Sequence, residues 1–386
     1  MNIGFDASRI TVSQRTGTEN YSYYLAQALA RVDKDNRYTL YFRKEPSEKL
    51  VDELVGDKDS FSIKVISWPR LWTQGGLAWE CVKNPPDILF VPAHTLPIIR
   101  HPSIYSVVTV HDLGFEYLPE YHQFPQKLYL DRMTRYAAAS ADHIIAVSSS
   151  TKKDLITKFG TEEERITVIH EGVDKQRFFP EEDTAKKVVE KYSLDFPYIL
   201  FVGTVQPRKN LRRLIKAFSL LVTSKRNSLE KVGKASNLKL LLAGKPGWLY
   251  DDIYSAPTEF GVADRVKFLG HVPGEDLPGL YQQAICFCLP SLYEGFGLPV
   301  LESMASGTPV VLANVSSLPE VGGEAAIYVD PYSAESIAQG LFELLSLAGS
   351  SEYEKLVSDG FARVNKFTWE QCARKTLAVL ALGGND

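Results

Sequence analysis

Residues 285–302 read ICFCLPSLYEGFGLPVLE and join three local patterns in direct succession. The apolar run Ile285–Leu289 suits a strand that is covered on both faces. Gly295 and Gly297 allow the backbone to turn sharply and to approach a ligand, and Pro299 suits the first turn of a helix. The stretch therefore predicts a buried strand, a glycine-rich loop and a helix.

The same succession of apolar run, polar turn and helix-like stretch recurs along the whole chain and restarts after a charged linker near residue 180. Strands that alternate with helices form parallel sheets with crossover helices. We therefore expect an α/β fold with two Rossmann-like, doubly wound domains, residues 1–180 and 181–367, facing a central cleft. The predicted strands are Ile3–Phe5, Tyr38–Phe42, Ile63–Ile66, Ile88–Val91, Ser106–Val110, Ile144–Val147, Ile166–Ile169, Tyr198–Val202, Leu238–Leu242, Val266–Leu269, Ile285–Leu289, Pro309–Leu312 and Ala326–Val329.

Composition narrows the class of protein. The 386 residues carry a net charge of −4, which argues against a nucleic-acid binder. No apolar run is long enough to span a membrane, and the N-terminus lacks the basic and apolar regions of a secretory signal. We expect a cytoplasmic protein whose four cysteines, none in a C-x-x-C pair, are reduced packing residues.

The loop after Ile285–Leu289 is the first candidate site. Free backbone N–H groups at the start of a helix attract anions. Glu294 and Glu302 flank the loop, and their carboxylates can accept hydrogen bonds from hydroxyl groups. A nucleotide sugar presents both phosphates and hydroxyls, so it suits this combination. The alternative is a tight loop in which Glu302 is only a favourable helix charge.

Two further turns each follow a predicted strand and open a helix. In the segment Gly203–Asn210, Arg208 and Lys209 are placed to pair with a diphosphate, although surface solvation explains them equally well. In the first turn of the chain, Gly17 lets the backbone approach a phosphate and Thr18 can cap the helix. A plain loop is the alternative there, because the G-x-G-x-x-G fingerprint of dinucleotide-binding domains is absent.

Polar residues also lie directly after two predicted strands in the first half of the chain. His111 follows Ser106–Val110 and can donate to a sugar hydroxyl or exchange a proton, or serve only in the structure. Ser148 ends the next strand and can bind in the same cleft, although helix capping explains it as well. Thr151 to Asp154 and Thr368 to Gln371 fit capping boxes. The two D-x-D strings begin at Asp33 and Asp57 in polar turns, so no metal site is predicted.

The segment Trp68–Lys83 mixes three tryptophans with basic residues. Such a mixture suits contact with a membrane surface or an acceptor. The alternative is a loop and helix that pack on the domain.

Taken together, these segments resemble glycosyltransferase family 4, the retaining nucleotide-sugar transferases of the GT-B fold that include glycogen synthases and mannosyltransferases. The resemblance covers nearly the whole chain. The family's E-x(7)-E motif matches Glu294 to Glu302, and its phosphate clamp matches Gly203–Asn210. Thr204 departs from the pattern, because many members have Arg at that position. The end of the chain resembles a helix that returns to the first domain, which here would be residues 368–386.

The resemblance implies a role for each candidate residue. Arg208 and Lys209 would pair with the diphosphate, and Glu302 would hold the ribose. Glu294 and His111 would act at the transferred hexose, beside the two cations. The donor site as a whole would comprise Gly17, Thr18, Ser148, Gly203, Thr204, Arg208, Lys209, Glu294, Gly295, Phe296, Gly297, Leu298 and Glu302.

The implied activity is that of a hexosyltransferase with no metal and no other cofactor. It would move a hexose, from UDP-glucose or GDP-mannose, to a glycan or lipid-linked saccharide in polysaccharide or cell-envelope synthesis, with room for a peripheral contact at the inner face of a membrane. Two alternatives stay open: a GT-B-fold nucleotide-sugar epimerase and a non-catalytic two-domain sugar-binding protein. A nicotinamide oxidoreductase is disfavoured because neither half carries the glycine fingerprint.

Overall fold

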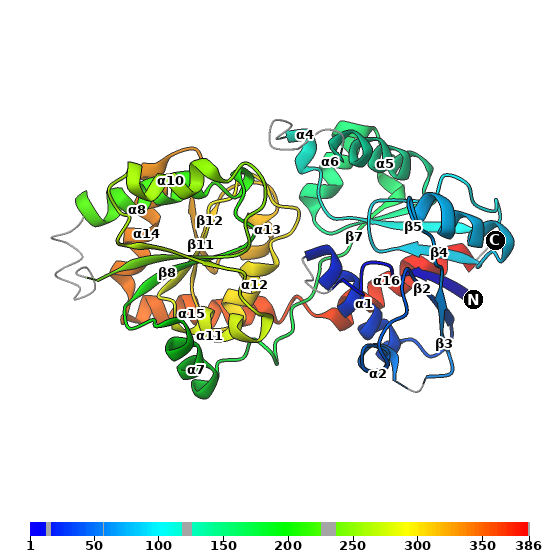
Figure 1. Cartoon of the computed structure of the whole chain (residues 1–386), viewed down its shortest axis with the longest axis horizontal. Helices are drawn as coiled ribbons and strands as arrows, with labels where there is room; N and C mark the ends of the chain where they lie inside the picture. Colours follow the sequence, from blue (N-terminus) through cyan, green and yellow to red (C-terminus); the bar gives the residue numbers. More distant parts are fainter. Residues whose placement is uncertain (13–16, 57, 118–125, 225–236, 385–386) are drawn as a thin grey trace. The chain divides into compact units, whose positions relative to one another are not determined.

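The chain forms two compact units in a computed structural model that describes residues 1–12, 17–56, 58–117, 126–224 and 237–384 (Figure 1). Unit 1 contains the described residues up to Gly172 and those from Phe367 onward, and unit 2 contains Val173–Lys366. The sequence pattern placed the first boundary after residue 180. The structure places it after Gly172, because Phe178 packs edge-on against Tyr281 at 6.0 Å within unit 2.

Unit 1 is built on a parallel sheet of seven strands in the order β3-β2-β1-β4-β5-β6-β7. All seven predicted strands of the first half are present, with ends within two residues of those expected. All four residues of β4 are buried, as expected for a strand covered on both faces. The strands are β1 (Asn2–Asp6), β2 (Arg37–Phe42), β3 (Phe61–Val65), β4 (Ile88–Val91), β5 (Tyr105–Val110), β6 (His143–Ala146) and β7 (Ile166–Val168).

The helices of unit 1 include a short π-helix, η1 (Thr73–Leu77), that leads directly into α3. The α-helices are α1 (Gly17–Val32), α2 (Glu48–Val55), α3 (Ala78–Lys83), α4 (Gly114–Tyr117), α5 (Gln126–Ser140), α6 (Ser149–Phe159) and α16 (Trp369–Leu380).

Unit 2 repeats the plan with a parallel sheet of six strands in the order β10-β9-β8-β11-β12-β13. Its predicted strands are likewise all present. They are β8 (Tyr198–Val202), β9 (Lys239–Ala243), β10 (Val266–Gly270), β11 (Cys286–Leu289), β12 (Val310–Ala313) and β13 (Ala326–Val329). The helices are α7 (Glu182–Tyr192), α8 (Leu211–Ser224), α10 (Asp251–Glu259), α11 (Leu277–Gln283), α12 (Leu298–Ala305), α13 (Leu318–Gly322), α14 (Ala334–Leu347) and α15 (Ser351–Val364).

In each sheet the strand order reverses beside the first strand of the unit. The pair β1 and β4 flanks this point in unit 1, and the pair β8 and β11 flanks it in unit 2. Open parallel sheets bind ligands outside the carboxyl ends of the strands at such a point. The loops that follow β8 and β11 are those that carry Arg208, Lys209 and Glu294.

The last long helix belongs to unit 1. Thr368 caps α16 by accepting a hydrogen bond from the backbone N–H of Gln371 at 3.2 Å, which confirms the helix start predicted there. Trp369 stacks on Tyr24 of α1, with ring centroids 5.4 Å apart. Gly172 lets the start of α16 pack closely against it, because a Cβ atom at Gly172 would lie 2.2 Å from the Trp369 backbone nitrogen.

Two predicted helix starts are wrong. Ser148, rather than Thr151, caps α6, because the Ser148 hydroxyl accepts the hydrogen bond from the Thr151 backbone N–H at 3.1 Å. Helix α1 already includes Gly17, so Thr18 lies inside the first turn and does not cap it. Residues 13–16 of that turn lie outside the described residues.

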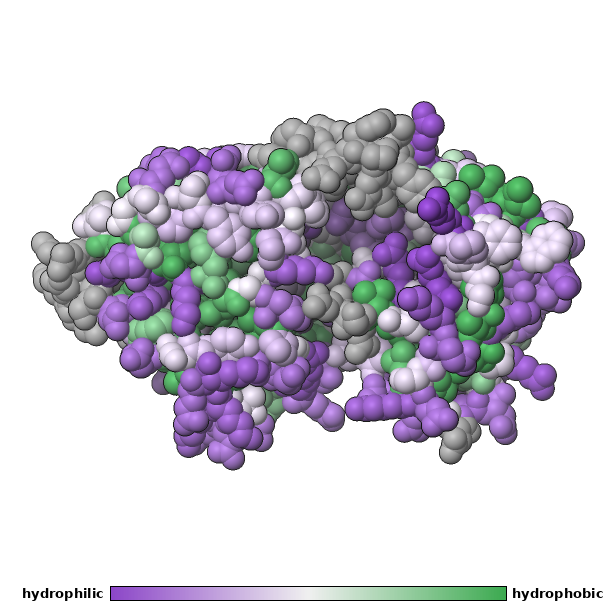
Figure 2. Space-filling model, in the orientation of Figure 1, coloured by the Kyte–Doolittle hydropathy of each residue, from purple (hydrophilic) through white to green (hydrophobic). Residues whose placement is uncertain are grey.

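The cysteines are all free and buried, as predicted. Burial raises the pKa of the Cys286 thiol to about 12, so this group stays protonated at neutral pH. Among the described helices, none has the length and apolar composition needed to cross a bilayer. Figure 2 shows hydrophilic residues over much of the visible surface, with apolar residues in smaller areas between them.

Candidate functional site

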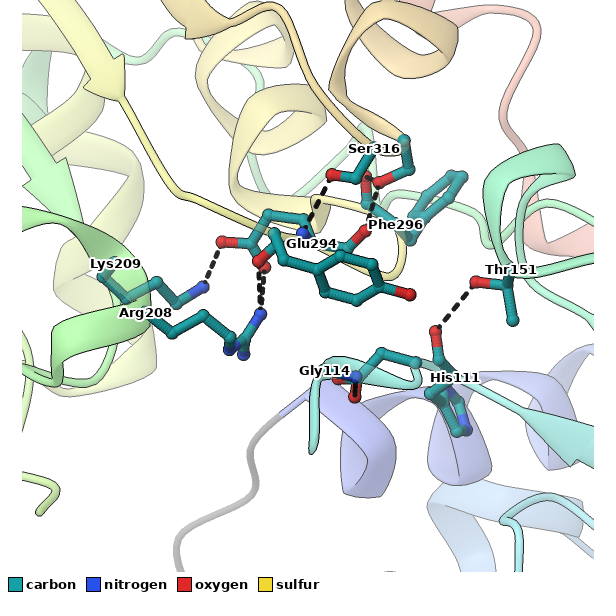
Figure 3. A network of polar contacts seen from close by, with 11 residues as sticks. His111, Gly114, Thr151, Arg208, Lys209, Glu294, Phe296 and Ser316 are labelled. Carbon is teal, nitrogen blue, oxygen red and sulfur yellow. Dashed lines mark hydrogen bonds and ion pairs between the residues drawn. The ribbon is translucent and has the colours of Figure 1, made fainter. Parts of the chain in front are cut away.

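Two cations and one carboxylate converge at the switch point of the unit 2 sheet (Figure 3). The Lys209 ammonium donates to one carboxylate oxygen of Glu294 at 2.6 Å, and the Arg208 guanidinium donates to the other at 3.1 Å. Arg208 also donates to the backbone carbonyl of Tyr293 at 2.6 Å. The sequence predicts that each loop contacts the donor, and the structure joins the two loops in one ion-paired cluster.

The backbone holds both loops in register. Arg208 and Lys209 lie in a single 3-10 turn, Pro207–Lys209, and the Arg208 carbonyl accepts a hydrogen bond from the Leu292 backbone N–H at 2.9 Å. Asn210 follows with φ of 60°, and its side-chain amide donates to the carbonyls of Pro290 and Pro331. The turn after β8 is therefore tied directly to the loop after β11.

Burial makes the charges of this cluster interact strongly. Glu294 is 6% exposed and Lys209 is 9% exposed. Burial alone would raise the pKa of Glu294, but the charges of Lys209 and Arg208 outweigh it and hold that pKa below its ordinary value. Glu294 is thus an anion at neutral pH, and the cluster carries one net positive charge.

The glycine-rich loop is held by two serines that the sequence analysis did not single out. The Glu294 backbone N–H donates to the Ser316 hydroxyl at 2.9 Å. The Ser317 hydroxyl donates to the carbonyls of Glu294 and Phe296, at 3.0 and 2.7 Å. Both serines follow β12 in a loop without helical or strand periodicity, so only the tertiary structure reveals their role.

The loop ends at the predicted helix start. Gly297 has a φ of 111°, which L side chains rarely adopt, and it forms the N-cap position of α12. Leu298 is the first residue of α12, and Pro299 lies in its first turn as expected. Gly295, Phe296 and Gly297 thus lie between Glu294 and the helix that carries Glu302, and Leu298 begins that helix.

Glu302 lies in α12 and faces a different environment from Glu294. The hydroxyl of Tyr281, from α11, donates to its carboxylate at 3.0 Å. Burial raises the pKa of Glu302, and the charge of Arg177 and the Tyr281 hydrogen bond only partly offset this rise. Tyr281 and Arg177 were not predicted, because each lies more than twenty residues away from Glu302 in the sequence.

The segment at Gly203 forms an extension of the sheet. The Gly203 backbone N–H donates to the Ala243 carbonyl at 2.9 Å, and that of Val205 donates to the Lys245 carbonyl at 3.0 Å. A Cβ atom on Gly244 would lie 1.8 Å from the Gly203 carbonyl oxygen. Gly203 and Thr204 therefore position the turn that carries Arg208. Their contact with the donor stays a prediction.

In unit 1, His111 is held by two acceptors. One ring nitrogen, Nε2, lies 3.0 Å from the Pro92 carbonyl oxygen, and the other, Nδ1, lies 3.2 Å from the Glu171 carboxylate. A carbonyl oxygen only accepts, so Nε2 carries a proton. The contact between Nδ1 and the Glu171 carboxylate is a hydrogen bond only if a second proton lies between them, on Nδ1 or on the carboxyl group. An imidazole contact with the sugar, as the resemblance implies, would require one of these bonds to open.

The other unit 1 candidates lie at helix starts. Gly17 is exposed, and a Cβ atom there would meet no other atom within 4 Å. Ser148 is fully buried as the cap of α6. The Thr151 hydroxyl donates to the His111 carbonyl at 3.3 Å, which ties this helix start to the end of β5 (Figure 3).

Across the described residues, no three His, Cys, Asp or Glu side chains gather in a group able to hold a metal ion. Asp33 instead accepts hydrogen bonds from the Tyr38 hydroxyl and the Asn36 amide, as expected of a turn residue. Asp57 lies outside the described residues. The expected independence from metal ions stays a prediction.

The unit 2 cluster can bind an anionic leaving group and stabilise the charge that grows on it. One buried cation, Lys209, and one partly buried cation, Arg208, lie beside a glycine-rich helix start and supply positive potential at a fixed place. The Glu294 carboxylate keeps both cations oriented while no anion is bound. Chemically, this arrangement suits cleavage of a bond to a diphosphate.

Comparison with known proteins agrees with this chemistry. The family model described as "Glycosyltransferase Family 4" matches residues 15–177, and that described as "Glycosyl transferases group 1" matches residues 182–361. The chain is 35% identical over 274 residues to O-antigen chain mannosyltransferase B of Escherichia coli, which covers 70% of this chain and 69% of that protein. It is 29% identical over 243 residues to O-antigen chain mannosyltransferase RfbU of Salmonella typhimurium, with 63% and 60% covered.

Solved structures show the same fold at low identity. Sucrose-phosphate synthase from Thermosynechococcus elongatus superposes with a TM-score of 0.74 at 20% identity, covering 98% of both chains. Anabaena HepE, solved in complex with UDP-glucose, superposes with a TM-score of 0.73 at 18% identity, covering 99% of both chains. These likenesses, together with the two Rossmann-like sheets, show the GT-B fold that the sequence predicted.

Proposed function

The chain belongs to glycosyltransferase family 4, and on that premise we propose that it transfers mannose from GDP-mannose to a glycan or lipid-linked saccharide, with retention of the anomeric configuration. Transfer of a hexose in glycan synthesis is supported by the family and by the two O-antigen mannosyltransferases compared above. Mannose is favoured over glucose because both O-antigen relatives compared above are named mannosyltransferases.

The observation that carries the proposal is the ion-paired cluster of Arg208, Lys209 and Glu294. Glycosyl transfer breaks the bond between the sugar C1 and the diphosphate oxygen and passes through an oxocarbenium-like state. Negative charge grows on the diphosphate as the bond breaks, so preorganised cations favour the transition state over the ground state. The diphosphate competes with Glu294 for both cations and leaves that carboxylate available to the hexose hydroxyls.

The remaining donor contacts follow from the same loops. We assign the ribose hydroxyls to Glu302 and the phosphate oxygens to the backbone of Gly295, Phe296, Gly297 and Leu298 at the start of α12. The donor contacts that the resemblance implies for His111 and Gly17 of unit 1 stay predictions. The protein would act in the cytoplasm, where nucleotide sugars are made.

The experiment is a donor assay with matched variants. Wild-type protein is incubated with GDP-mannose or UDP-glucose and a panel of saccharide-diphosphate lipids, and release of GDP or UDP is followed together with the anomeric NMR signals of the product. We expect GDP-mannose to be the better donor and the product to have the donor's configuration. A faster reaction with UDP-glucose would contradict the donor assignment, and recovery of an epimerised donor without transfer would contradict transfer itself.

Arg208→Ala and Arg212→Ala form the matched pair for the site. Arg208 belongs to the buried cluster, whereas Arg212 lies half-exposed on α8 and pairs with Glu259 at 2.5 Å. Loss of one preorganised hydrogen-bond donor at a site of growing negative charge typically costs about 100- to 1,000-fold in kcat. We expect that loss for Arg208→Ala and a nearly unchanged rate for Arg212→Ala.

We also predict that transfer continues after chelation. The positive charge at the diphosphate would come from Arg208, Lys209 and the start of α12 rather than from a divalent ion. The measurement is the rate of nucleotide release in EDTA compared with added Mg²⁺ or Mn²⁺. A rate that collapses in EDTA and returns with Mn²⁺ would show that a metal ion shares the task.

A further inference from the structure

Unit 1 exposes an unusual group of large apolar side chains outside the candidate site. Leu71, Trp79 and Ile99 are each more than 60% exposed, at 65, 63 and 67%. Soluble proteins leave single apolar side chains exposed, but seldom several from neighbouring segments. We call this group the apolar face, and it consists of Trp68, Leu71, Trp79, Val82, Ile98 and Ile99.

Hydrogen bonds join the segments that carry the apolar face. The Gln74 side chain of η1 donates to the Leu96 carbonyl at 3.0 Å and accepts from the Ile98 backbone N–H at 2.9 Å. Beyond α3, the His101 backbone N–H donates to the Cys81 carbonyl at 3.4 Å. The loop at Ile98 and Ile99 is therefore fastened to the π-helix and to α3, whose outer side bears Trp79 and Val82.

The backbone positions two residues of the apolar face, Trp68 and Leu71. Trp68 rests on the backbone of two glycines, because a Cβ atom on Gly75 would lie 2.2 Å from the Trp68 indole nitrogen and one on Gly76 would lie 2.9 Å from its Cβ. Leu71 has a φ of 51°, a conformation that is costly for a branched side chain. The Leu71 side chain is nevertheless exposed, so its burial does not compensate for the cost of this backbone conformation.

Two exposed cations adjoin the apolar face in the sequence, although the whole chain is acidic. Arg70 and Lys83 are exposed next to Leu71 and Val82 in the sequence. Glu80, in the same helix, is buried and pairs with Lys64 at 2.5 Å, so its charge is compensated. Exposed cations therefore flank exposed aromatic and aliphatic groups.

We propose that unit 1 docks through the apolar face on the surface of an anionic lipid bilayer. Tryptophan, leucine and isoleucine enter the boundary between headgroups and acyl chains, and Arg70 and Lys83 pair with anionic headgroups. A saccharide is a poorer fit, because among the six side chains only the two indoles can donate a hydrogen bond. The proposal concerns attachment to a surface and is independent of the donor assignment.

The test is cosedimentation of the full chain with unilamellar vesicles. Wild-type protein should bind vesicles that contain phosphatidylglycerol, bind pure phosphatidylcholine far more weakly, and lose much of the binding when the salt concentration is raised. We expect Trp79→Ser combined with Ile99→Ser to weaken partitioning by at least about tenfold, because two inserting side chains are removed. Arg70→Glu combined with Lys83→Glu should abolish the preference for anionic vesicles.

Matched controls come from unit 2. Phe179 and Tyr332 are 68 and 65% exposed, so the double variant Phe179→Ser with Tyr332→Ser removes exposed apolar side chains from unit 2. The double variant Lys186→Glu with Lys355→Glu reverses two exposed positive charges there. Both controls should bind like wild type, and all variants should keep the wild-type melting temperature. The proposal is overturned if wild type binds neither vesicle, if the controls weaken binding equally, or if the apolar-face variants change only the KM for a saccharide acceptor.

Discussion

Glu294 and Glu302 belong to one motif, yet their surroundings act on their pKa values in opposite directions. Glu294 lies between Lys209 and Arg208, whose charges lower its pKa despite burial. Glu302 is desolvated beside the Tyr281 hydroxyl, and its pKa is raised. A lowered pKa in the folded state stabilises the fold at high pH, and a raised one stabilises it at low pH.

We predict that Glu294→Gln lowers the free energy of unfolding at neutral pH. The substitution leaves the buried Lys209 and the partly buried Arg208 without their anion, a loss of about 1–3 kcal/mol for a charged partner. Because the carboxylate stabilises the fold above its unfolded pKa, the difference from wild type should shrink as the pH falls through the folded pKa of Glu294. Urea unfolding from neutral to acid pH measures this. A deficit that stays constant with pH would mean that packing rather than charge is lost.

Glu302→Gln should have the opposite effect and serves as the matched comparison. The wild-type carboxyl favours folding when protonated, and this advantage is lost as the pH rises through its raised folded pKa. The neutral amide avoids the cost of a desolvated charge, so we expect the variant to be more stable than wild type at pH 7 to 8 and equal to it in acid. Donor binding should weaken in the same variant if Glu302 holds the ribose. Equal or lower stability at pH 8 would contradict the assignment of burial as the dominant cause.

At the scale of single elements, helix starts carry much of the local structure of the site. Ser148 caps α6 through the Thr151 backbone N–H, and the Thr151 hydroxyl bonds to the His111 carbonyl. The sequence suggested a capping box three residues further along, because Thr151 and Asp154 also fit that pattern. A pattern of polar residues identifies the helix, whereas the cap depends on which residue leaves the strand in an extended conformation.

We predict that Ser148→Ala lowers the free energy of unfolding by about 1–2 kcal/mol, since a buried cap is lost. Ser350→Ala is the control, because Ser350 caps α15 of unit 2 through the Tyr353 backbone N–H at 3.3 Å and is not one of the candidate site residues. Both variants are compared by thermal unfolding and by transfer rate per folded molecule. A stability loss for Ser350→Ala alone would contradict the role of Ser148 as a cap.

The elements themselves follow closely from the sequence. Every predicted strand is present, because runs such as Ile88–Val91 and Ile285–Leu289 are apolar enough to be buried on both faces and are bounded by polar turns. The π-helix at Thr73–Leu77 was not expected, because its glycines read as a loop and its form depends on packing against Trp68.

At the scale of the whole molecule, the candidate site was only partly predictable. Arg208, Lys209 and Glu294 were identified from turns next to strands, but their ion pairs span 85 and 86 residues and become visible only when β8 and β11 lie side by side. Tyr281, Ser316, Ser317 and Glu171 carry no local signal. Their positions follow from the register of neighbouring elements, which a single sequence does not specify.

Unit 1 combines the first part of the chain with α16, which lies near the other end of the sequence. Trp369 of α16 stacks on Tyr24 and meets Tyr21 edge-on at 5.9 Å, so α1 and the sheet it covers depend on residues from the other end of the chain. Trp369→Ala should cost up to about 3 kcal/mol, at the low end for a large aromatic residue because Trp369 is only partly buried. The loss should be confined to unit 1.

Hydrogen exchange followed by mass spectrometry measures this loss by segment. We expect faster exchange in β1 and α1 of the Trp369→Ala variant and unchanged exchange in β8 and β11, which belong to unit 2. Trp79→Ala removes the same side chain from an exposed position in unit 1, so it should leave exchange in β1 and α1 as in wild type. If Trp369→Ala accelerated exchange in both units equally, the two units would unfold as one, because loss of a contact within unit 1 alone does not open the sheet of unit 2.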